Sequence, residues 1–237
     1  MERTPALEPF SDAKILDSWR KNSAPWTDAV RAGRIASRRL ATDRAIVDAI
    51  RECAPRTVLD IGCGEGWLAR ALAAPRSGVD APLEVTGIDA VADLVERARS
   101  AGGGRFLVHS YADIAAGRLQ LRFDLVVCNF SLLGKESVEG VFRAVPALLT
   151  PAGCFVVQTL HPLAACGDLP YVDGWRAGSW AGFDDGFTDP APWYFRTLGG
   201  WVALFVQSGL KLTAVREPLL TAAGPPASVI FIATAAV

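Results

Sequence analysis

Strand-like apolar runs and helix-like apolar periodicity alternate along most of this chain. Between residues 57 and 72, a short run rich in Val and Leu ends at closely spaced glycines, and apolar residues then recur at helical spacing. Further strand-like runs at 83–89, 105–109, 123–129 and 154–160 are accompanied by helix-like segments at 91–101 and 138–149. A helix at 197–209 and strands at 210–216 and 228–234 complete the pattern. This order predicts an α/β fold, a Rossmann-like doubly wound sheet that is mainly parallel, with helices on both faces and an antiparallel C-terminal hairpin.

Two segments lie outside this alternation. Residues 1–53 are predicted to form an N-terminal helical cap region, in which Arg31, Arg34 and Arg38 have the spacing of one helical face. Residues 161–196, within the main domain at 54–237, lose regular patterning and are rich in aromatic residues. Long irregular loops in compact domains are usually functional, which predicts an aromatic lid over a pocket. A hydrophobic cluster that only covers the sheet is the alternative.

Composition narrows the choice of partners. The formal net charge is −1, so no overall positive field favours nucleic acid. The five cysteines stand singly, which favours a reducing compartment and argues against a zinc cluster or a disulfide framework. Residues 1–10 lack an apolar signal core, and no apolar run reaches the roughly 20 residues of a membrane span. We therefore expect a cytoplasmic protein without a metal or membrane contact, as a monomer or homodimer.

The first strand and its glycines carry the clearest chemical signal. Glycines in such a turn permit a left-handed backbone and close approach of a ligand, beside the unsatisfied N–H groups of the next helix. A dinucleotide motif requires Gly-x-Gly-x-x-Gly, whereas Trp67 stands in place of the third glycine. Asp60 places a carboxylate at the strand end, where it could hold an amino group. The run from Val58 to Gly66 resembles the first motif of class I S-adenosylmethionine-dependent methyltransferases.

The resemblance covers residues 57–160 by motif and implies S-adenosyl-L-methionine as cofactor, with S-adenosyl-L-homocysteine as product. It makes 54–237 the methyltransferase domain. Asp89, at the end of the second strand, is suited to a ribose diol, although this signal alone fits NAD equally. Tyr111-Ala112 replaces the family's Asp-Ala pair near adenine. The cofactor-binding residues that we expect are Arg38, Asp60, Gly62, Gly64, Asp89, Ala90, Tyr111, Ala112, Asn129 and Phe130. Arg38 is expected to bind the cofactor's carboxylate as a bidentate partner, with a solvated face as the alternative. Tyr111 could stack on the base or only pack.

His161 is the candidate general base, because Pro162 favours an extended His161 at the carboxyl edge of the sheet. A histidine that only hydrogen-bonds the loop is the alternative. The aromatic residues expected to contact the acceptor are Trp26, Tyr171, Trp193 and Tyr194.

The function implied is in-line methyl transfer to an oxygen, nitrogen or carbon of a small molecule. The chain after the fourth strand reads Asn129-Phe130-Ser131-Leu132, unlike the Asn-Pro-Pro-Tyr motif of base methylation. Two alternatives remain: a nicotinamide-dependent oxidoreductase, and a non-catalytic cofactor-binding or interaction protein.

Overall fold

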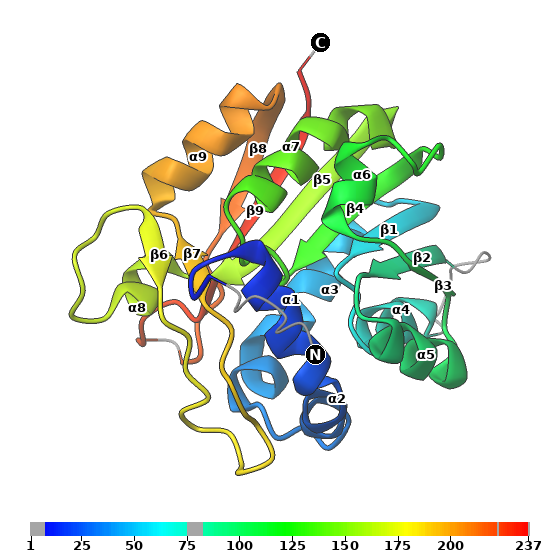
Figure 1. The fold of residues 1–237 in the computed structure, drawn as a ribbon. Coiled ribbons are helices and arrows are strands. Elements are labelled where there is room, and N and C mark those ends of the chain that lie inside the picture. The colour runs from blue at the N-terminus through cyan, green and yellow to red at the C-terminus, as the bar shows by residue number, and fades with distance from the viewer. Residues whose placement is uncertain (1–7, 75–82, 222, 237) are drawn as a thin grey trace.

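The structure, a computed structural model, describes residues 8–74, 83–221 and 223–236. A seven-stranded sheet in the order β3-β2-β1-β4-β5-β9-β8 forms its centre (Figure 1). The strands of this sheet are β1 (Thr57–Ile61), β2 (Glu84–Asp89), β3 (Arg105–Val108), β4 (Phe123–Asn129), β5 (Leu149–Leu160), β8 (Leu210–Arg216) and β9 (Ser228–Ala235). Strands β1 to β5 pair in parallel, whereas β9 runs antiparallel to both β5 and β8. The predicted fold class is therefore confirmed, including the antiparallel C-terminal pair.

Helices cover both faces of the sheet, as the near-continuous apolar strands require. The covering helices are α3 (Asp43–Glu52), α4 (Trp67–Ala73), α5 (Ala92–Ala101), α6 (Tyr111–Ala115), α7 (Glu136–Leu148) and α9 (Leu198–Gln207). Successive strand residues point to opposite faces, so Leu59 and Ile61 join the core under α7 while Val58 joins the core with α3 and α4. Asp60 is thereby directed to the same face as Val58.

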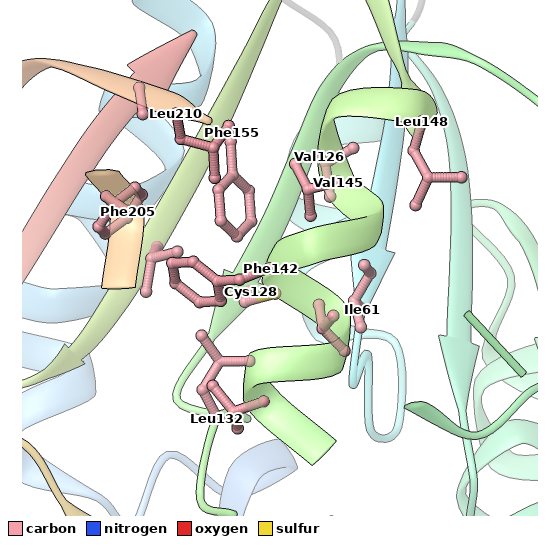
Figure 2. Packing of buried hydrophobic residues seen from close by; sticks show 14 of the residues in the cluster. Ile61, Val126, Cys128, Leu132, Phe142, Val145, Leu148, Phe155, Phe205 and Leu210 are labelled. Carbon is pink, nitrogen blue, oxygen red and sulfur yellow. The ribbon is translucent and has the colours of Figure 1, made fainter. Parts of the chain in front are cut away.

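Aromatic packing fills the core between α7, α9 and the sheet. The ring of Phe142 from α7 lies 5.2 Å from that of Phe155 and 4.9 Å from that of Phe205, both edge-on (Figure 2). All three side chains are fully buried. This packing fixes α7 against β4 and β5, and with it the loop that joins β4 to α7.

The N-terminal region forms α1 (Asp12–Lys21), α2 (Ser23–Arg31) and the short π-helix η1 (Arg38–Thr42) before α3. The single helical face expected for Arg31, Arg34 and Arg38 is wrong, because α2 ends at Arg31 and Gly33 turns the chain with a φ of 61°. Helices α1 and α2 lie at the carboxyl edge of the sheet (Figure 1). In contrast, α3 packs against the sheet as part of its core. Of the predicted cap region, residues 1–53, the described residues before α3 are thus the ones that lie outside this core.

Residues 161–196, which we call the lid segment, contain more regular structure than the sequence pattern suggested. The segment begins with α8 (Pro162–Cys166) and includes a two-stranded antiparallel pair, β6 (Gly174–Arg176) and β7 (Trp193–Phe195). Tyr194 N donates to Leu133 O at 2.7 Å, so β7 is attached to the loop after β4. Among the described residues, none of the helices is long and apolar enough to cross a bilayer.

Candidate functional site

The glycine turn, residues 62–66, joins β1 to α4 at the point where the strand order reverses, and ligands of open α/β sheets bind at such a point. Gly62, Gly64 and Gly66 all have positive φ, at 77°, 56° and 82°. A Cβ at Gly62 would lie 2.4 Å from the Cβ of Ser131, whereas at Gly64 the nearest atom would be Trp26 Nε1 at 3.8 Å. Gly62 is thus required by packing, and Gly64 presents open backbone to a ligand.

Two buried side-chain oxygens, one from a carboxyl group and one from an amide, lie at the carboxyl ends of the paired strands β1 and β4. Asp60 Oδ1 and Asn129 Oδ1 are both buried, and neither has a hydrogen-bond partner in the described part of the chain. Burial, and then the neighbouring Asp89 carboxylate, raise the pKa of Asp60 to about 7. Buried polar atoms are normally paired, so these oxygens point to a ligand that donates protons or carries positive charge.

Asp89 binds the glycine turn through backbone hydrogen bonds. Its Oδ2 accepts from Gly64 N at 3.0 Å, and its Oδ1 accepts from Val91 N at 2.9 Å. Desolvation raises the pKa of Asp89 despite these bonds, because water is largely excluded around the carboxylate. The carboxylate predicted for a ribose diol is therefore placed at the end of β2, directly beside the turn, with Ala90 next to it.

Tyr111 is hydrogen-bonded within the protein, and its stacking on adenine stays a prediction. Its hydroxyl donates to Ser131 O at 2.9 Å, and Ser131 Oγ donates to Ile61 O at 2.7 Å. These bonds attach the loop after β4 to the last residue of β1, directly before the glycine turn. Desolvation raises the pKa of Tyr111 well above its ordinary value. Ala112 is exposed on α6, and its backbone contact with adenine stays a prediction.

Phe130, directly after β4, has a φ of 53°, which is rare for a residue with a bulky side chain. Its backbone N donates to Gln158 O at 2.8 Å, which holds this conformation. Non-glycine residues with a left-handed backbone often mark functional sites. Asn129 and Phe130 are thus brought to the carboxyl edge beside the turn, as predicted.

Arg38 is engaged with protein groups. Its Nε donates to Asp43 Oδ1 at 2.9 Å, and its guanidinium lies 4.5 Å from the centre of the Trp67 ring. It lines a cavity with Val30, Arg31, Trp67 and Arg70, and none of the three turn glycines takes part in that lining. Its role toward the cofactor carboxylate stays a prediction.

His161 is fully buried at the end of β5 and uses both ring nitrogens. Nε2 lies 2.7 Å from Glu217 Oε1, and Nδ1 accepts from Leu163 N at 3.3 Å as the N-cap of α8. Since Nδ1 accepts, the proton lies on Nε2 and is donated to Glu217. A base role for His161 requires the imidazole to exchange one of these contacts for the acceptor, and it stays a prediction.

The aromatic residues predicted for the acceptor separate into two groups. Trp26 lies edge-on to Trp19 at 5.1 Å and joins Phe183 of the lid segment at 6.3 Å, next to the glycine turn. Tyr194 lies near the loop after β4, with the guanidinium of Arg196 at 4.8 Å from its ring. Trp193 contacts Phe195, as does Tyr171, whose hydroxyl accepts from Leu198 N at 2.9 Å.

The sequence prediction missed two residues that hold the site together. Glu65, between two turn glycines, is buried and accepts from Arg31 Nε at 2.8 Å and from Arg70 Nη2 at 2.6 Å. Asn22 exchanges two hydrogen bonds with the backbone of Thr188 in the lid segment, at 2.7 and 2.9 Å. A charged residue between two glycines of a tight turn is a sequence signal that could have identified Glu65 as a structural residue of the turn. No local pattern indicates the Asn22 contact, because 166 residues separate its partners.

Among the described residues, no group of three or more His, Cys, Asp and Glu side chains is placed to hold a metal ion.

Comparison with known proteins agrees with this geometry. The family described as "Methyltransferase domain" matches residues 35–214. An uncharacterized methyltransferase of Mycobacterium tuberculosis is 31% identical over 134 residues, which are 56% of this chain and 65% of that protein. A ubiquinone biosynthesis O-methyltransferase of Xanthomonas axonopodis is 35% identical over 131 residues, covering 53% of this chain and 52% of the relative. The chain thus spans less than two thirds of the length of either relative.

Solved structures give the same answer. An S-adenosylmethionine-dependent methyltransferase from Mesorhizobium loti superposes with a TM-score of 0.56 at 25% identity, covering 78% of this chain and 95% of the other. The family match extends over most of the sheet domain, including the glycine turn, Asp60 and Asp89. The chain therefore belongs to the methyltransferase-domain family and has the fold of S-adenosylmethionine-dependent methyltransferases.

Proposed function

We propose that this protein transfers the methyl group of S-adenosylmethionine to a small-molecule acceptor. The proposal rests on two buried, unpartnered oxygens, of Asp60 and Asn129, at the ends of the paired strands β1 and β4, the first of which leads into the open glycine turn at Gly64. A ligand with an ammonium and a sulfonium group supplies the proton donors and positive charge that such oxygens favour. A nicotinamide dinucleotide would place phosphates at a turn that directly follows the strand carrying the buried Asp60 carboxylate.

The residues that would hold the cofactor follow from their place in the sheet. We assign the amino-acid end to Gly62, Gly64 and Asp60, and the ribose hydroxyls to Asp89 with Ala90. The region of Tyr111 and Ala112 is assigned to the adenine side, and Asn129 with Phe130 to the sulfonium side. When bound, the cofactor supplies an electrophilic methyl group.

The chain's own part in the reaction is to hold the acceptor in line with that methyl group. Positioning the acceptor atom at roughly 3–3.5 Å supplies most of the rate enhancement in such a displacement. We assign the acceptor wall to Tyr171, Trp193 and Tyr194 of the lid segment, with Trp26 closing its cofactor end. For a hydroxyl acceptor, we propose His161 as the base that removes the proton.

A small-molecule acceptor is favoured by the lid segment, which is attached to the loop after β4 through Tyr194 and to the N-terminal helices through Thr188. The similar Xanthomonas protein is named a ubiquinone biosynthesis O-methyltransferase, which supports an oxygen acceptor as the first class to test. We also propose a cytoplasmic location, supported by cysteines that are all free thiols in the structure. Action as a monomer or homodimer, without nucleic acid or membrane, completes the proposal.

An acceptor screen tests the proposed function. Release of S-adenosylhomocysteine is measured with panels of phenols, carboxylic acids and amines, using wild-type protein and Asp89→Ala. We expect turnover with members of one panel, and its loss in Asp89→Ala at limiting cofactor. Absence of turnover on every panel, by a protein that binds the cofactor, would support the non-catalytic alternative.

A further inference from the structure

Helix α2 places one polar group directly in front of the glycine turn. In the described structure, the only atom within 4 Å of a Cβ built on Gly64, apart from its chain neighbours, is Trp26 Nε1 at 3.8 Å. No hydrogen bond of this indole N–H is found among the described residues, and it is not one of the buried unpartnered atoms. The N–H is therefore available at the surface where the backbone of Gly64 is open.

Contacts at both ends of α2 fix the position of Trp26. Ser23 Oγ donates to Asp93 Oδ2 of α5 at 2.5 Å. At the other end, Arg31 Nε binds Glu65, whose carboxylate side chain is completely buried, and Arg31 Nη2 donates to Arg97 O at 3.1 Å. Glu65 is also bound by Arg70 of α4, so one carboxylate joins α2, the turn and the following helix.

The chemistry of the cofactor indicates what this N–H would meet. With the ribose at Asp89 and the amino group at Asp60, the carboxylate is two bonds from the amino nitrogen, and we place it in the open space beside Gly64. A carboxylate needs N–H donors and cannot be placed against Asp60 itself. Arg38 is the competing donor, but Asp43 and Trp67 already engage it, at a cavity that excludes the turn glycines.

We propose that Trp26 Nε1–H recognises the amino-acid carboxylate of the cofactor, and that Glu65 is a positioning residue that holds α2 over the turn through Arg31. This inference rests on the proposed function, because it concerns the same cofactor. It assigns to Trp26 a role toward the cofactor in addition to its place at the end of the acceptor wall.

The test compares two ligands by calorimetry. S-adenosylhomocysteine carries the amino-acid carboxylate, and 5′-methylthioadenosine lacks the whole amino-acid group. We expect Trp26→Phe to weaken S-adenosylhomocysteine roughly 10- to 100-fold, as for a lost hydrogen bond to a charged group, and to leave 5′-methylthioadenosine unchanged. Trp19→Phe is the matched control, since its ring lies 5.1 Å from that of Trp26, and it should change neither affinity.

Several results would overturn the proposal. They are unchanged binding of S-adenosylhomocysteine by Trp26→Phe, equal loss of both ligands in that variant, or selective loss in Arg38→Ala alone. If wild-type protein binds neither ligand, the proposed function fails; if wild-type binds both and Trp26→Phe behaves like it, only this inference fails.

The positioning role of Glu65 has a separate readout. Glu65→Gln should weaken S-adenosylhomocysteine selectively and, without any ligand, increase deuterium exchange in residues 23–31. Glu52→Gln, which breaks an exposed ion pair with Arg216, is the control and should do neither. Unchanged exchange in residues 23–31, or equal weakening of both ligands, would contradict the role given to Glu65.

Discussion

Asp60 is a buried carboxyl group whose protonation links pH to both folding and binding. Its pKa of about 7 in the folded chain exceeds the ordinary value of 3.8, so the folded state binds its proton more tightly than the unfolded state does. A carboxyl group of this kind destabilises the fold progressively as pH rises from about 4 to about 7. A ligand ammonium beside Asp60 would offset that cost, which explains why a binding site retains such a group.

The first prediction concerns Asp60→Asn. Without ligand, we expect its stability relative to wild-type to rise between pH 5 and pH 8, by up to about 3 kcal/mol, because the variant has no charge to bury. Thermal melts at both pH values measure this difference, and calorimetry at pH 8 should show weaker cofactor binding. Asp48→Asn, at an exposed pair, is the control. An equal stability difference at both pH values would show that Asp60 is not buried in its charged form.

A second residue-scale prediction concerns His161. If it is the base for a hydroxyl acceptor, His161→Ala should lower kcat by about 10²–10⁴ at saturating cofactor, with cofactor affinity retained. The measurement is kcat on the acceptor found by screening, together with the melting temperature. A lowered melting temperature with wild-type kcat would instead assign His161 only to capping α8 and binding Glu217.

At the scale of elements, the cap and the lid segment act as one unit over the carboxyl edge. Besides the Asn22–Thr188 exchange, Ser18 Oγ donates to Asp189 O at 2.6 Å, and Lys21 Nζ lies 2.6 Å from Asp189 Oδ2. Trp180 of the lid segment lies edge-on to Trp19 of α1 at 5.9 Å. Opening the site therefore requires α1 and the lid segment to separate or to move together.

The third prediction tests this attachment. Asn22→Ala removes both hydrogen bonds to Thr188, after which Thr188 O retains only the bond from Trp180 Nε1 and Thr188 N has no side-chain partner. Each lost hydrogen bond costs roughly 0.5–1.5 kcal/mol. We expect faster proteolysis and faster deuterium exchange within residues 177–192, with little change in the sheet. Arg44→Ala, at an exposed helical pair, serves as control. If exchange in 177–192 stays at the wild-type rate, Asn22 does not hold the lid segment.

Elements coded by local pattern were predictable, and those set by distant contacts were not. The strand, turn and helix at 57–73 follow from adjacent residues, as do β4 and α7. Helix α6 is held by a capping box between Ser110 and Asp113 and was missed, because only five residues form it. Strands β6 and β7 exist through pairing with each other across an irregular stretch, which no local periodicity encodes.

The same division applies to the site. Asp60 and Asp89 were predictable because parallel strands bring their carboxyl ends to one edge. Arg38 was assigned to the cofactor because it is one of several arginines with helical spacing in the N-terminal region. Its pairing with Asp43 was not predicted, because it depends on the π-helix η1, which the sequence pattern did not indicate. Glu65 was missed because its burial depends on Arg31 arriving from another helix.

At the scale of the whole molecule, the sheet, the cap and the lid segment converge on one edge. The sheet supplies the glycine turn and the unpartnered oxygens, α2 supplies Trp26, and the lid segment supplies the aromatic residues that we propose for the acceptor wall. These parts come from distant sequence positions and are assembled only in the folded chain. A cofactor that binds them therefore binds the folded state and not the unfolded one, and should raise the free energy of unfolding of the whole molecule. We expect S-adenosylmethionine to bind at this edge.

Calorimetric titration of the folded protein with S-adenosylmethionine, S-adenosylhomocysteine and NADH tests that claim most directly. We predict micromolar binding of the first two, loss of both in Asp89→Ala and Gly64→Val, and no binding of NADH. A folded protein that binds NADH, but neither S-adenosylmethionine nor S-adenosylhomocysteine, would contradict the claim.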